Sequence, residues 1–381
     1  MKHYNVGIVG YGFIGRVHAY GHLTLPLFYD PPPCRTTISH ICTAHAGTVE
    51  KGRQQIGARV ATTDFRAITE NPEIDIVHIC TPNRLHLEPL LSAMRHGKHI
   101  YCDKPLVADW AEAETIRQAM ADYRGIAQMT FQNRFFPATM RAKQLIDEGF
   151  LGRVLEFRAS YLHSGSANPD APLKWKLSGA SGGGVIADLA SHILDLMHHL
   201  LGDFAELCAS TGMAYAERPS LADPTVRVPV DAEDNVQMLL RTRSGAAGIV
   251  EATKLATGAE DEMRFEIHGA LGALRFNSMA PHHLEAYDAR RSDQPLGGQR
   301  GWTRIDAGQR YPQPAGFPGP KFSIGWIRTH AACLVHFLQG VVSGAPVEPG
   351  LGQGLYVQRL IECVRVSAGA RRWVGVDEIE A

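Results

Sequence analysis

The sequence lacks a dominant sign of charge. Its 38 Lys and Arg residues are balanced by 39 Asp and Glu residues, which gives a formal net charge of -1 at pH 7. Because basic and acidic residues are interspersed, no basic field is available to contact the phosphates of a nucleic acid. We therefore expect no nucleic-acid partner.

Long apolar runs are also lacking. No run approaches the roughly 20 apolar residues that a helix needs to span a bilayer. The first ten residues, MKHYNVGIVG, lead into a strand pattern without the features of a signal peptide. We therefore expect a cytoplasmic protein without a membrane partner.

Cysteine is sparse and scattered. The seven cysteines are an odd number, with no CxxC pair and no Cys/His cluster at zinc spacing. This pattern predicts reduced thiols that lie mostly in the core, and no metal site. The cysteines are Cys34, Cys42, Cys80, Cys102, Cys208, Cys333 and Cys363.

The chain is long enough for two domains, with 381 residues of which 45% are hydrophobic. In residues 1–130, short β-branched runs alternate with stretches that carry apolar residues at helical spacing. This alternation predicts a doubly wound parallel sheet covered by helices. The expected strands are residues 4–9, 36–42, 74–80, 98–102 and 125–129, and the expected helices include 63–70, 84–97 and 109–123.

In residues 131–381 the pattern changes to longer alternating strands. SG and GALG turns within two of these stretches predict antiparallel hairpins, and hence an α/β domain with a large open, mostly antiparallel sheet. Residues 280–325 are rich in Pro and Gly and predict an irregular surface excursion. The expected strands are residues 153–162, 235–255 and 263–277, and the expected helices are 182–202, 330–344 and 352–370.

A glycine-rich turn, GYGFIG, follows the first expected strand. In a βαβ unit, Gly10 would permit the tight turn, Gly12 would let a pyrophosphate approach the backbone, and Gly15 would allow close helix packing. Phe13 and Ile14 complete the predicted dinucleotide turn, whose N–H groups would face the anion. A purely structural turn would need one or two of these glycines but hardly all three.

Thr43 directly follows the second expected strand. An acid at this position accepts hydrogen bonds from the ribose of NAD and repels the extra phosphate of NADP. A hydroxyl can bond to either group, and no Arg follows immediately, although Lys51 and Arg53 lie further on. The sequence therefore leaves the choice between NAD and NADP open.

Polar side chains follow two further strands, at the edge where ligands of a doubly wound sheet collect. Asp103 and Lys104 follow one strand, and Thr81, Asn83 and His86 follow the other. A lysine beside a reacting hydroxyl can favour its alkoxide. The alternative is that Asp103 lies near a helix start and Lys104 is a solvated surface charge.

Asp188, His192, Asp195 and His199 are spaced to share one face of an otherwise apolar helix. A solvated stripe would more often use Lys, Glu or Gln, which are better helix formers. A metal could bind His and Asp one turn apart, but no third ligand of suitable spacing is present.

As a set, GYGFIG, TPNRLH, CDKPL and GGGVIADLASHILDL resemble the signatures of the glucose-fructose oxidoreductase and inositol dehydrogenase (Gfo/Idh/MocA) family. The resemblance runs from residue 4 to about residue 375. It implies a Rossmann domain over residues 1–130 and a substrate-binding, oligomerising α/β domain over residues 131–381. It also implies NAD(P)-dependent oxidation or reduction of a sugar or polyol.

The resemblance also implies roles for individual residues. Lys104, Asp188 and His192 match the family's catalytic lysine, aspartate and histidine, with His192 as the base for the hydroxyl proton. Asp103 stands where Glu is usual, and Asp195 and His199 receive no role. The segments that would border the substrate supply Arg134, Trp175 and Lys176.

Two other functions use the same residues. A sensor or regulator of this fold could hold a dinucleotide and a sugar without turnover. A lyase or glycosidase could use bound NAD transiently. For any of the three, an open sheet with an apolar face must be covered, so we expect a homodimer or homotetramer.

Overall fold

The computed structural model describes residues 1–379, and their packing divides them into two compact units. Unit 1 comprises residues 1–132, 311–319 and 325–358, and unit 2 comprises residues 133–310, 320–324 and the described chain from Arg359 onward. Nothing in the sequence pattern indicated that residues 325–358 return to unit 1. The assignment of cofactor binding and substrate binding to separate domains stays a prediction.

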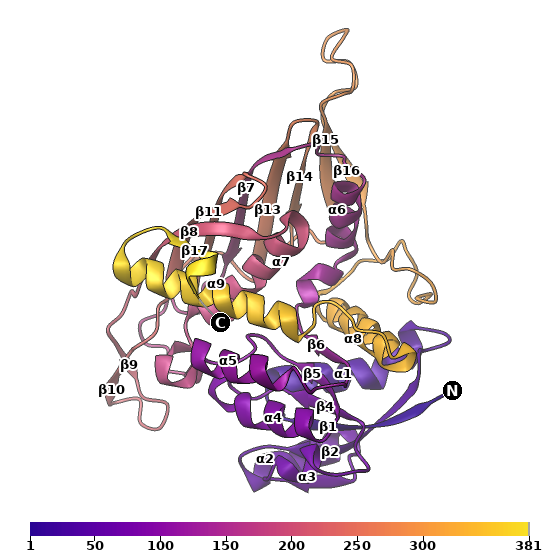
Figure 1. The fold of residues 1–381 in the computed structure, drawn as a ribbon, viewed down its shortest axis with the longest axis vertical. Coiled ribbons are helices and arrows are strands. Elements are labelled where there is room, and N and C mark those ends of the chain that lie inside the picture. Colours follow the sequence, from indigo (N-terminus) through magenta and orange to yellow (C-terminus); the bar gives the residue numbers. More distant parts are fainter. Residues whose placement is uncertain (380–381) are drawn as a thin grey trace. The chain divides into compact units, whose positions relative to one another are not determined.

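Unit 1 is built on a six-stranded parallel sheet with the order β3-β2-β1-β4-β5-β6. The chain therefore winds outward from β1 in both directions, which confirms the predicted doubly wound sheet. Figure 1 shows these strands in the indigo and purple part of the ribbon. The strands are β1 (His3–Val9), β2 (Arg35–Cys42), β3 (Val60–Thr62), β4 (Ile76–Ile79), β5 (His99–Cys102) and β6 (Ala127–Met129).

Helices cover this sheet because their apolar positions recur on one side. One close contact is made possible by Gly21, where a side chain would meet Leu334 at 2.9 Å. The helices are α1 (Phe13–Phe28), α2 (Ala46–Ile56), α3 (Arg66–Thr69), α4 (Leu87–Arg95), α5 (Trp110–Ala119), α8 (Trp326–Ser343) and the start of α9 (Leu351–Ala370).

The five strands expected in unit 1 are all present, but two details differ from prediction. Helix α3 is only four residues long, against the eight expected over residues 63–70. Strand β3 was missed because its three residues lie at the sheet edge and are too few to show a pattern.

A chain of imidazoles lies buried between α1 and the sheet. His22 Nε2 lies 2.9 Å from His78 Nε2, and His78 Nδ1 lies 3.0 Å from His18 Nδ1. The chain ends at Cys80, whose Sγ is 3.1 Å from His18 Nδ1. Burial holds the pKa of His18 and His78 well below its usual range and lowers the pKa of His22 to about 3. These rings are therefore neutral in the folded protein.

The neutral imidazoles predict acid sensitivity. His22 binds a proton near pH 6.5 when unfolded but near pH 3 when folded, so its contribution to stability is complete above pH 6.5 and is lost as pH falls toward 3. For this residue alone, the free energy of unfolding should drop by about 1.4 kcal/mol between about pH 7.5 and about pH 5.5. When urea unfolding is measured at both pH values, the decrease in the free energy of unfolding should be about 1.4 kcal/mol smaller in His22→Gln than in wild type. His3→Gln, at an exposed position, is the control, and equal pH dependence in all three proteins would contradict the prediction.

Unit 2 contains a nine-stranded sheet with the order β16-β15-β14-β13-β7-β12-β11-β8-β17. Every pairing is antiparallel except that of β7 with β12, as the alternating pattern predicted. The strands are β7 (Val154–Leu162), β8 (Phe204–Gly212), β11 (Asn235–Thr242), β12 (Ala247–Thr253), β13 (Glu262–Gly269), β14 (Gly272–Asn277), β15 (His283–Asp288), β16 (Trp302–Asp306) and β17 (Val374–Gly375); β9 (Glu217–Pro219) and β10 (Arg227–Pro229) form a separate ribbon.

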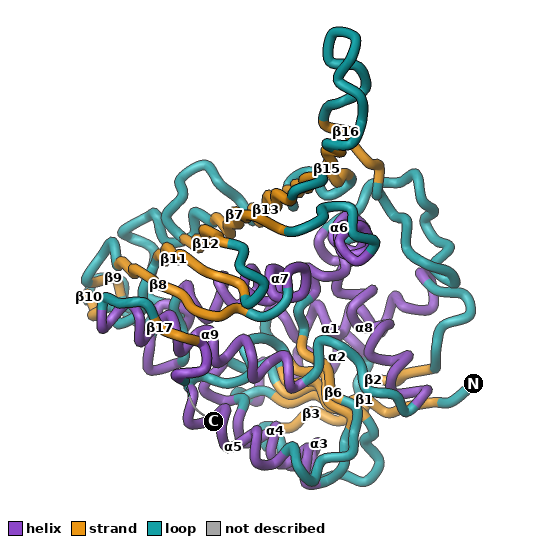
Figure 2. The backbone as a smooth tube through the Cα atoms, turned by 45° about the horizontal axis from the view of Figure 1, so that its top comes forward, coloured by secondary structure: helices purple, strands orange, loops and turns teal. Residues whose placement is uncertain are grey.

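Two helices, α6 (Pro137–Asp147) and α7 (Ser191–Leu201), pack on one face of this sheet (Figure 2). The inward positions of the strands are apolar, as in Val236, Met238 and Leu240 of β11. The prediction of an irregular excursion over residues 280–325 was wrong in part. Leu284 and Ala286 alternate inward in β15, and only the surrounding Pro and Gly residues hid this short strand.

The other face of the sheet carries a row of side chains in register. Charges alternate along Arg158, Glu266, Arg275 and Glu285 on neighbouring strands. At the other end of the row, Leu239 and Ile249 lie opposite each other and are half-exposed. The outer face is thus part charged and part apolar, rather than apolar throughout.

Across the described residues, no helix combines the length and hydropathy that a bilayer span requires. No disulfide forms within residues 1–379, and six of the seven cysteines are buried, as the sequence predicted.

Candidate active site

The glycine turn of unit 1 gives each glycine a different environment. Gly10 has φ +95°, and a side chain there would meet the backbone carbon of Cys80 at 2.5 Å. A side chain at Gly15 would collide with the carbonyl oxygen of Gly10, whereas Gly12 has open space around it. Gly12 precedes α1 without a side-chain cap, so no capping side chain accepts from the first N–H groups of the helix. Phe13 is exposed and Ile14 is half-buried. The turn can therefore admit a pyrophosphate.

The end of β2 has a hydroxyl, and no basic residue follows it in the first turn of α2. Thr43 Oγ1 donates to the carbonyl oxygen of His45 at 3.0 Å, just before α2 begins. The first turn of α2 has no basic residue, and Arg53 in its last turn is paired with Glu50 at 2.7 Å. A phosphate at this strand end would have no guanidinium or ammonium partner from α2's first turn.

The loop after β4 is tied to the loop after β5 by His86. This imidazole is fully buried. Its Nε2 lies 2.9 Å from the carbonyl oxygen of Thr81, and its Nδ1 lies 3.1 Å from those of Pro105 and Leu106. These contacts give the ring a role in joining two loops, and the predicted contact of His86 with the dinucleotide stays a prediction. Thr81 itself is half-buried, and its hydroxyl donates to Leu85.

Asp103 and Lys104 follow β5 directly, and both are partly exposed. The backbone N–H of Asp103 donates to Ile79 at 2.9 Å, which continues the sheet into this loop. The Lys104–Pro105 peptide bond is cis. Neither side chain caps a helix, because the N-cap of α5 is Asp109.

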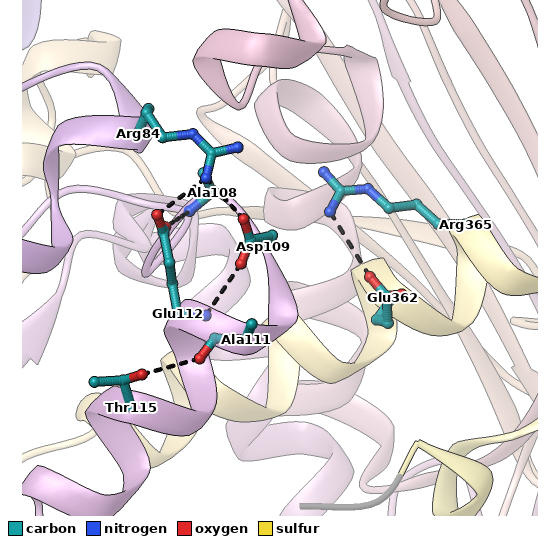
Figure 3. Close-up of polar contacts among 8 residues, drawn as sticks. All are labelled: Arg84, Ala108, Asp109, Ala111, Glu112, Thr115, Glu362 and Arg365. Carbon is teal, nitrogen blue, oxygen red and sulfur yellow. Dashed lines mark hydrogen bonds and ion pairs between the residues drawn. The ribbon is translucent and has the colours of Figure 1, made fainter.

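The start of α5 is held by a polar cluster that Figure 3 shows. Asp109 accepts from the N–H of Glu112 at 3.0 Å, and Glu112 accepts from the N–H of Ala108 at 3.0 Å. Arg84, next to Asn83, reaches both carboxylates at 2.7 and 3.0 Å. This reciprocal cap stabilises the helix start and fixes the loop that carries Asn83, whose side chain is buried.

In unit 2, the predicted helix over residues 182–202 is not uniform. Ile186–Ala190 winds as a π-helix before α7 begins at Ser191. The chain enters it through tight glycine contacts: a side chain at Gly183 would meet the carbonyl oxygen of Trp175 at 2.6 Å, and one at Gly184 would collide with Glu233. Such π segments recur at functional sites. Asp188 lies within this one and His192 lies in the first turn of α7.

Asp188 is bound by two ammonium groups. Its Oδ1 is 2.8 Å from Lys176 Nζ, and its Oδ2 is 3.1 Å from Lys254 Nζ. The side chain of Lys176 is 51% exposed, whereas those of Lys254 and Asp188 are only 8% and 12% exposed. The carboxylate is therefore held from a solvated side and from a buried side.

His192 is buried next to a tyrosine. The rings of His192 and Tyr161 lie 5.8 Å apart, and the Tyr161 hydroxyl donates to Asp261 at 2.7 Å. Burial raises the pKa of Tyr161 well above its usual range. Tyr161 is thus a neutral wall beside the imidazole.

Arg134 contacts the C-terminal half of the acidic stripe, the helix face formed by Asp188, His192, Asp195 and His199. Its Nε donates to Asp195 at 2.8 Å, and its Nη2 donates to the other oxygen of the same buried carboxylate. Its Nη1 lies 3.2 Å from His199 Nδ1. Burial, and then the Arg134 charge, lower the pKa of His199 to about 3. The contacts give Arg134 a structural role, and its predicted contact with substrate stays a prediction.

The loop that carries Trp175 and Lys176 is anchored by a fully buried arginine. Arg218 donates to the carbonyl oxygens of Ser166 at 2.6 Å and Asn168 at 2.7 Å. Trp175 is 38% exposed, and Lys176 Nζ lies 5.9 Å from its ring centroid. The anchored loop therefore holds the indole ring of Trp175 and the ammonium of Lys176 side by side.

Sequence reasoning missed Lys254, Tyr161 and Arg218. A signal for Lys254 was present, because Gly248, Val250 and Ala252 are the inward positions of β12 and residue 254 continues that alternation. A lysine in the inward phase of a strand needs a buried partner. Tyr161 and Arg218 show no comparable signal, since aromatic residues are common inward and the carbonyl acceptors of Arg218 are invisible in sequence.

Metal ligands do not gather in residues 1–379: no three His, Cys, Asp or Glu side chains are arranged to hold an ion.

Both units match known family models. Residues 4–131 match an oxidoreductase family with an NAD-binding Rossmann fold. Residues 139–275 match the GFO/IDH/MocA C-terminal domain. These matches cover most of the chain and confirm the family resemblance.

Individual relatives are similar over their full length. The chain is 34% identical to levoglucosan dehydrogenase of Pseudarthrobacter phenanthrenivorans, with 100% of each chain covered. It is 25% identical to inositol 2-dehydrogenase of Rhizobium meliloti, with 97% of this chain and 98% of the other covered. A solved levoglucosan dehydrogenase in complex with NADH and L-sorbose has a TM-score of 0.93 at 32% identity, with 99% of each chain covered. An NAD binding oxidoreductase from Klebsiella pneumoniae has a TM-score of 0.91 at 30% identity, covering 98% of this chain and 99% of the other.

The buried Arg134–Asp195 pair predicts a stability effect. Arg134→Met would leave the Asp195 carboxylate buried without its guanidinium, and the free energy of unfolding should fall by about 3–5 kcal/mol. Removing both charges in Arg134→Met with Asp195→Leu should recover much of that loss. Arg141→Met, which breaks an exposed pair with Glu148, should cost less than about 1 kcal/mol. Urea unfolding checks all three, and an Arg134→Met protein as stable as wild type would contradict the structural role.

Proposed function

The chain belongs to the Gfo/Idh/MocA family of NAD-binding oxidoreductases, and from this premise we propose that it is a sugar or polyol dehydrogenase. The reaction moves a hydride between the nicotinamide and a secondary alcohol or ketone of a sugar, an inositol or a related polyol. The observation that carries the proposal is the pair Asp188 and His192, one turn apart at the π segment, with Asp188 bound to two lysines. The names of relatives make levoglucosan and inositols the first substrates to try.

The roles proposed for the protein groups follow from their chemistry. The nicotinamide, when bound, supplies the hydride acceptor or donor. His192 takes the proton of the reacting hydroxyl, because an imidazole exchanges protons near neutral pH. Lys104 holds and polarises the same oxygen, and Asp188 accepts from a neighbouring hydroxyl. Trp175 offers an apolar ring to the C–H face of a sugar, and Lys176 a donor beside it.

For the cofactor, we assign the glycine turn with Phe13 and Ile14 to the pyrophosphate. Thr43 faces the ribose, and Thr81, Asn83, Asp103 and Lys104 belong to the strand ends of the nicotinamide half. We propose NAD rather than NADP, because a 2′-phosphate beside Thr43 would find no cation in the first turn of α2.

The proposal predicts turnover that depends on three side chains. Purified protein with NAD⁺ should reduce the cofactor in the presence of one member of a panel of levoglucosan, L-sorbose, inositols and simple pyranoses. NADP⁺ should give a lower kcat/KM. His192→Ala and Lys104→Ala should each lose about 10²–10⁴ in kcat, measured by absorbance of reduced cofactor, and Asp188→Asn should be impaired as well.

Matched controls are His96→Ala and Lys321→Ala, both at exposed positions, which should retain wild-type rates. Near-normal rates in the His192 and Lys104 variants would refute the site assignment. Tight NADH binding without hydride transfer to any of the panel would instead indicate a sensor, and product formed without net cofactor reduction would indicate a lyase or glycosidase.

We also propose that the outer face of the unit 2 sheet pairs with a second copy, as a homodimer or within a homotetramer. The apolar pair Leu239 and Ile249 beside alternating charges is self-complementary when two copies meet about a two-fold axis.

The proposed assembly predicts a measurable mass. Light scattering at micromolar concentration should give two or four times the 41.7 kDa of one chain. Leu239→Glu with Ile249→Glu should shift the protein to monomer, because like charges would face each other across the axis. Gln118→Glu, at an exposed position of α5 in unit 1, serves as a charge control away from the proposed interface. A monomeric wild type would contradict the proposal.

A further inference from the structure

Lys254 has a side chain that is buried in unit 2 and a backbone that is fixed on both sides. It follows β12 in the inward phase, and its side chain is only 8% exposed. Its backbone N–H donates to the carbonyl oxygen of Asp234 at 2.8 Å, and its carbonyl oxygen accepts from the backbone N–H of Ser166 at 2.8 Å. A buried ammonium is costly unless it is paired, and a core strand would normally place an apolar residue in this phase. The lysine therefore needs a reason that packing does not supply.

The partners of the ammonium supply that reason. Lys254 Nζ lies 3.1 Å from Asp188 Oδ2 and 3.4 Å from the carbonyl oxygen of Lys176. Lys176 Nζ contacts the other oxygen of the same carboxylate, but its side chain is 51% exposed. An exposed ion pair is screened and loses side-chain entropy, whereas a buried one is directional and strong. Lys254 is thus the contact that fixes the carboxylate, and Lys176 is the adjustable one.

Asp188 is fixed at the place where the helix geometry is irregular. It lies inside the π segment Ile186–Ala190, and His192 follows in the first turn of α7. The orientation of the carboxylate relative to the imidazole therefore depends on a contact from outside the helix. Resting on the proposed function, we propose that Lys254 is a positioning residue, which orients Asp188 for the reacting sugar and thereby affects turnover more than sugar binding.

The test separates positioning from simple structural support. Lys254→Met should lower kcat by about 30- to 100-fold, because misplacement of a reacting group by about 1 Å can cost that much, with the KM for sugar changed less than about threefold. Lys254→Arg should restore at least part of kcat, since it keeps the charge. Lys254→Met combined with Asp188→Asn should be no slower than Asp188→Asn alone, because residues that act as one unit are not additive.

Two comparisons complete the design. Lys176→Met should raise the KM for sugar more than it lowers kcat, and Lys143→Met, from an exposed pair with Asp147, should behave as wild type. Thermal unfolding and NADH affinity are measured for each variant, so that a folding defect is recognised; if Lys254→Met does not fold, Lys254→Arg and Lys254→Gln carry the same comparison.

Each outcome bears on one claim. An unchanged kcat in folded Lys254→Met, or losses that add in the double variant, would overturn the positioning role while the dehydrogenase function stands. A wild type without turnover on the whole sugar panel would overturn the proposed function and, with it, a positioning role in that reaction.

Discussion

The arrangement of unit 2 depends on how the carboxylate of Asp188 is compensated. A carboxylate at 12% exposure requires a partner at close range, and here two ammonium groups provide it from different parts of the chain. The first ammonium group belongs to Lys254, which takes an inward position after β12. The second belongs to Lys176, whose loop approaches the helix. Arg218 anchors that loop through the carbonyl oxygens of Ser166 and Asn168. Two segments that are distant in sequence thus converge on one buried carboxylate.

The same principle divides the acidic stripe into two halves. Asp195 and His199 are matched by Arg134, which is itself buried, so this half is saturated inside the protein. Asp188 is matched by one fixed and one solvated lysine, which leaves it able to exchange a contact with Lys176 for a contact with a ligand. The acidic stripe looks uniform in sequence, but Asp195 and His199 are paired inside the protein, whereas Asp188 keeps one solvated partner.

The sequence predicted the features that follow from periodicity and from glycine. The parallel sheet, the open sheet and the glycine turn were all visible, because alternation and φ-positive positions are local properties. Partners of charges were not visible, since Arg134 and Asp195 are 61 residues apart and no local pattern joins them. The contacts of His86 were not visible for the same reason: the carbonyl oxygens of Pro105 and Leu106 belong to another loop.

The end of β2 shows how an oxygen can serve where the family usually has an acid. The hydroxyl proton of Thr43 is engaged by the carbonyl oxygen of His45, so the oxygen presents lone pairs, which can accept from a ribose hydroxyl as a carboxylate does. It carries no charge, however, and cannot repel a 2′-phosphate. Discrimination against NADP would then rest on the lack of a basic residue in the first turn of α2, with Arg53 held by Glu50. Because selectivity draws on repulsion of the wrong ligand as well as attraction of the right one, a hydroxyl at this position gives a smaller preference for NAD than a carboxylate would.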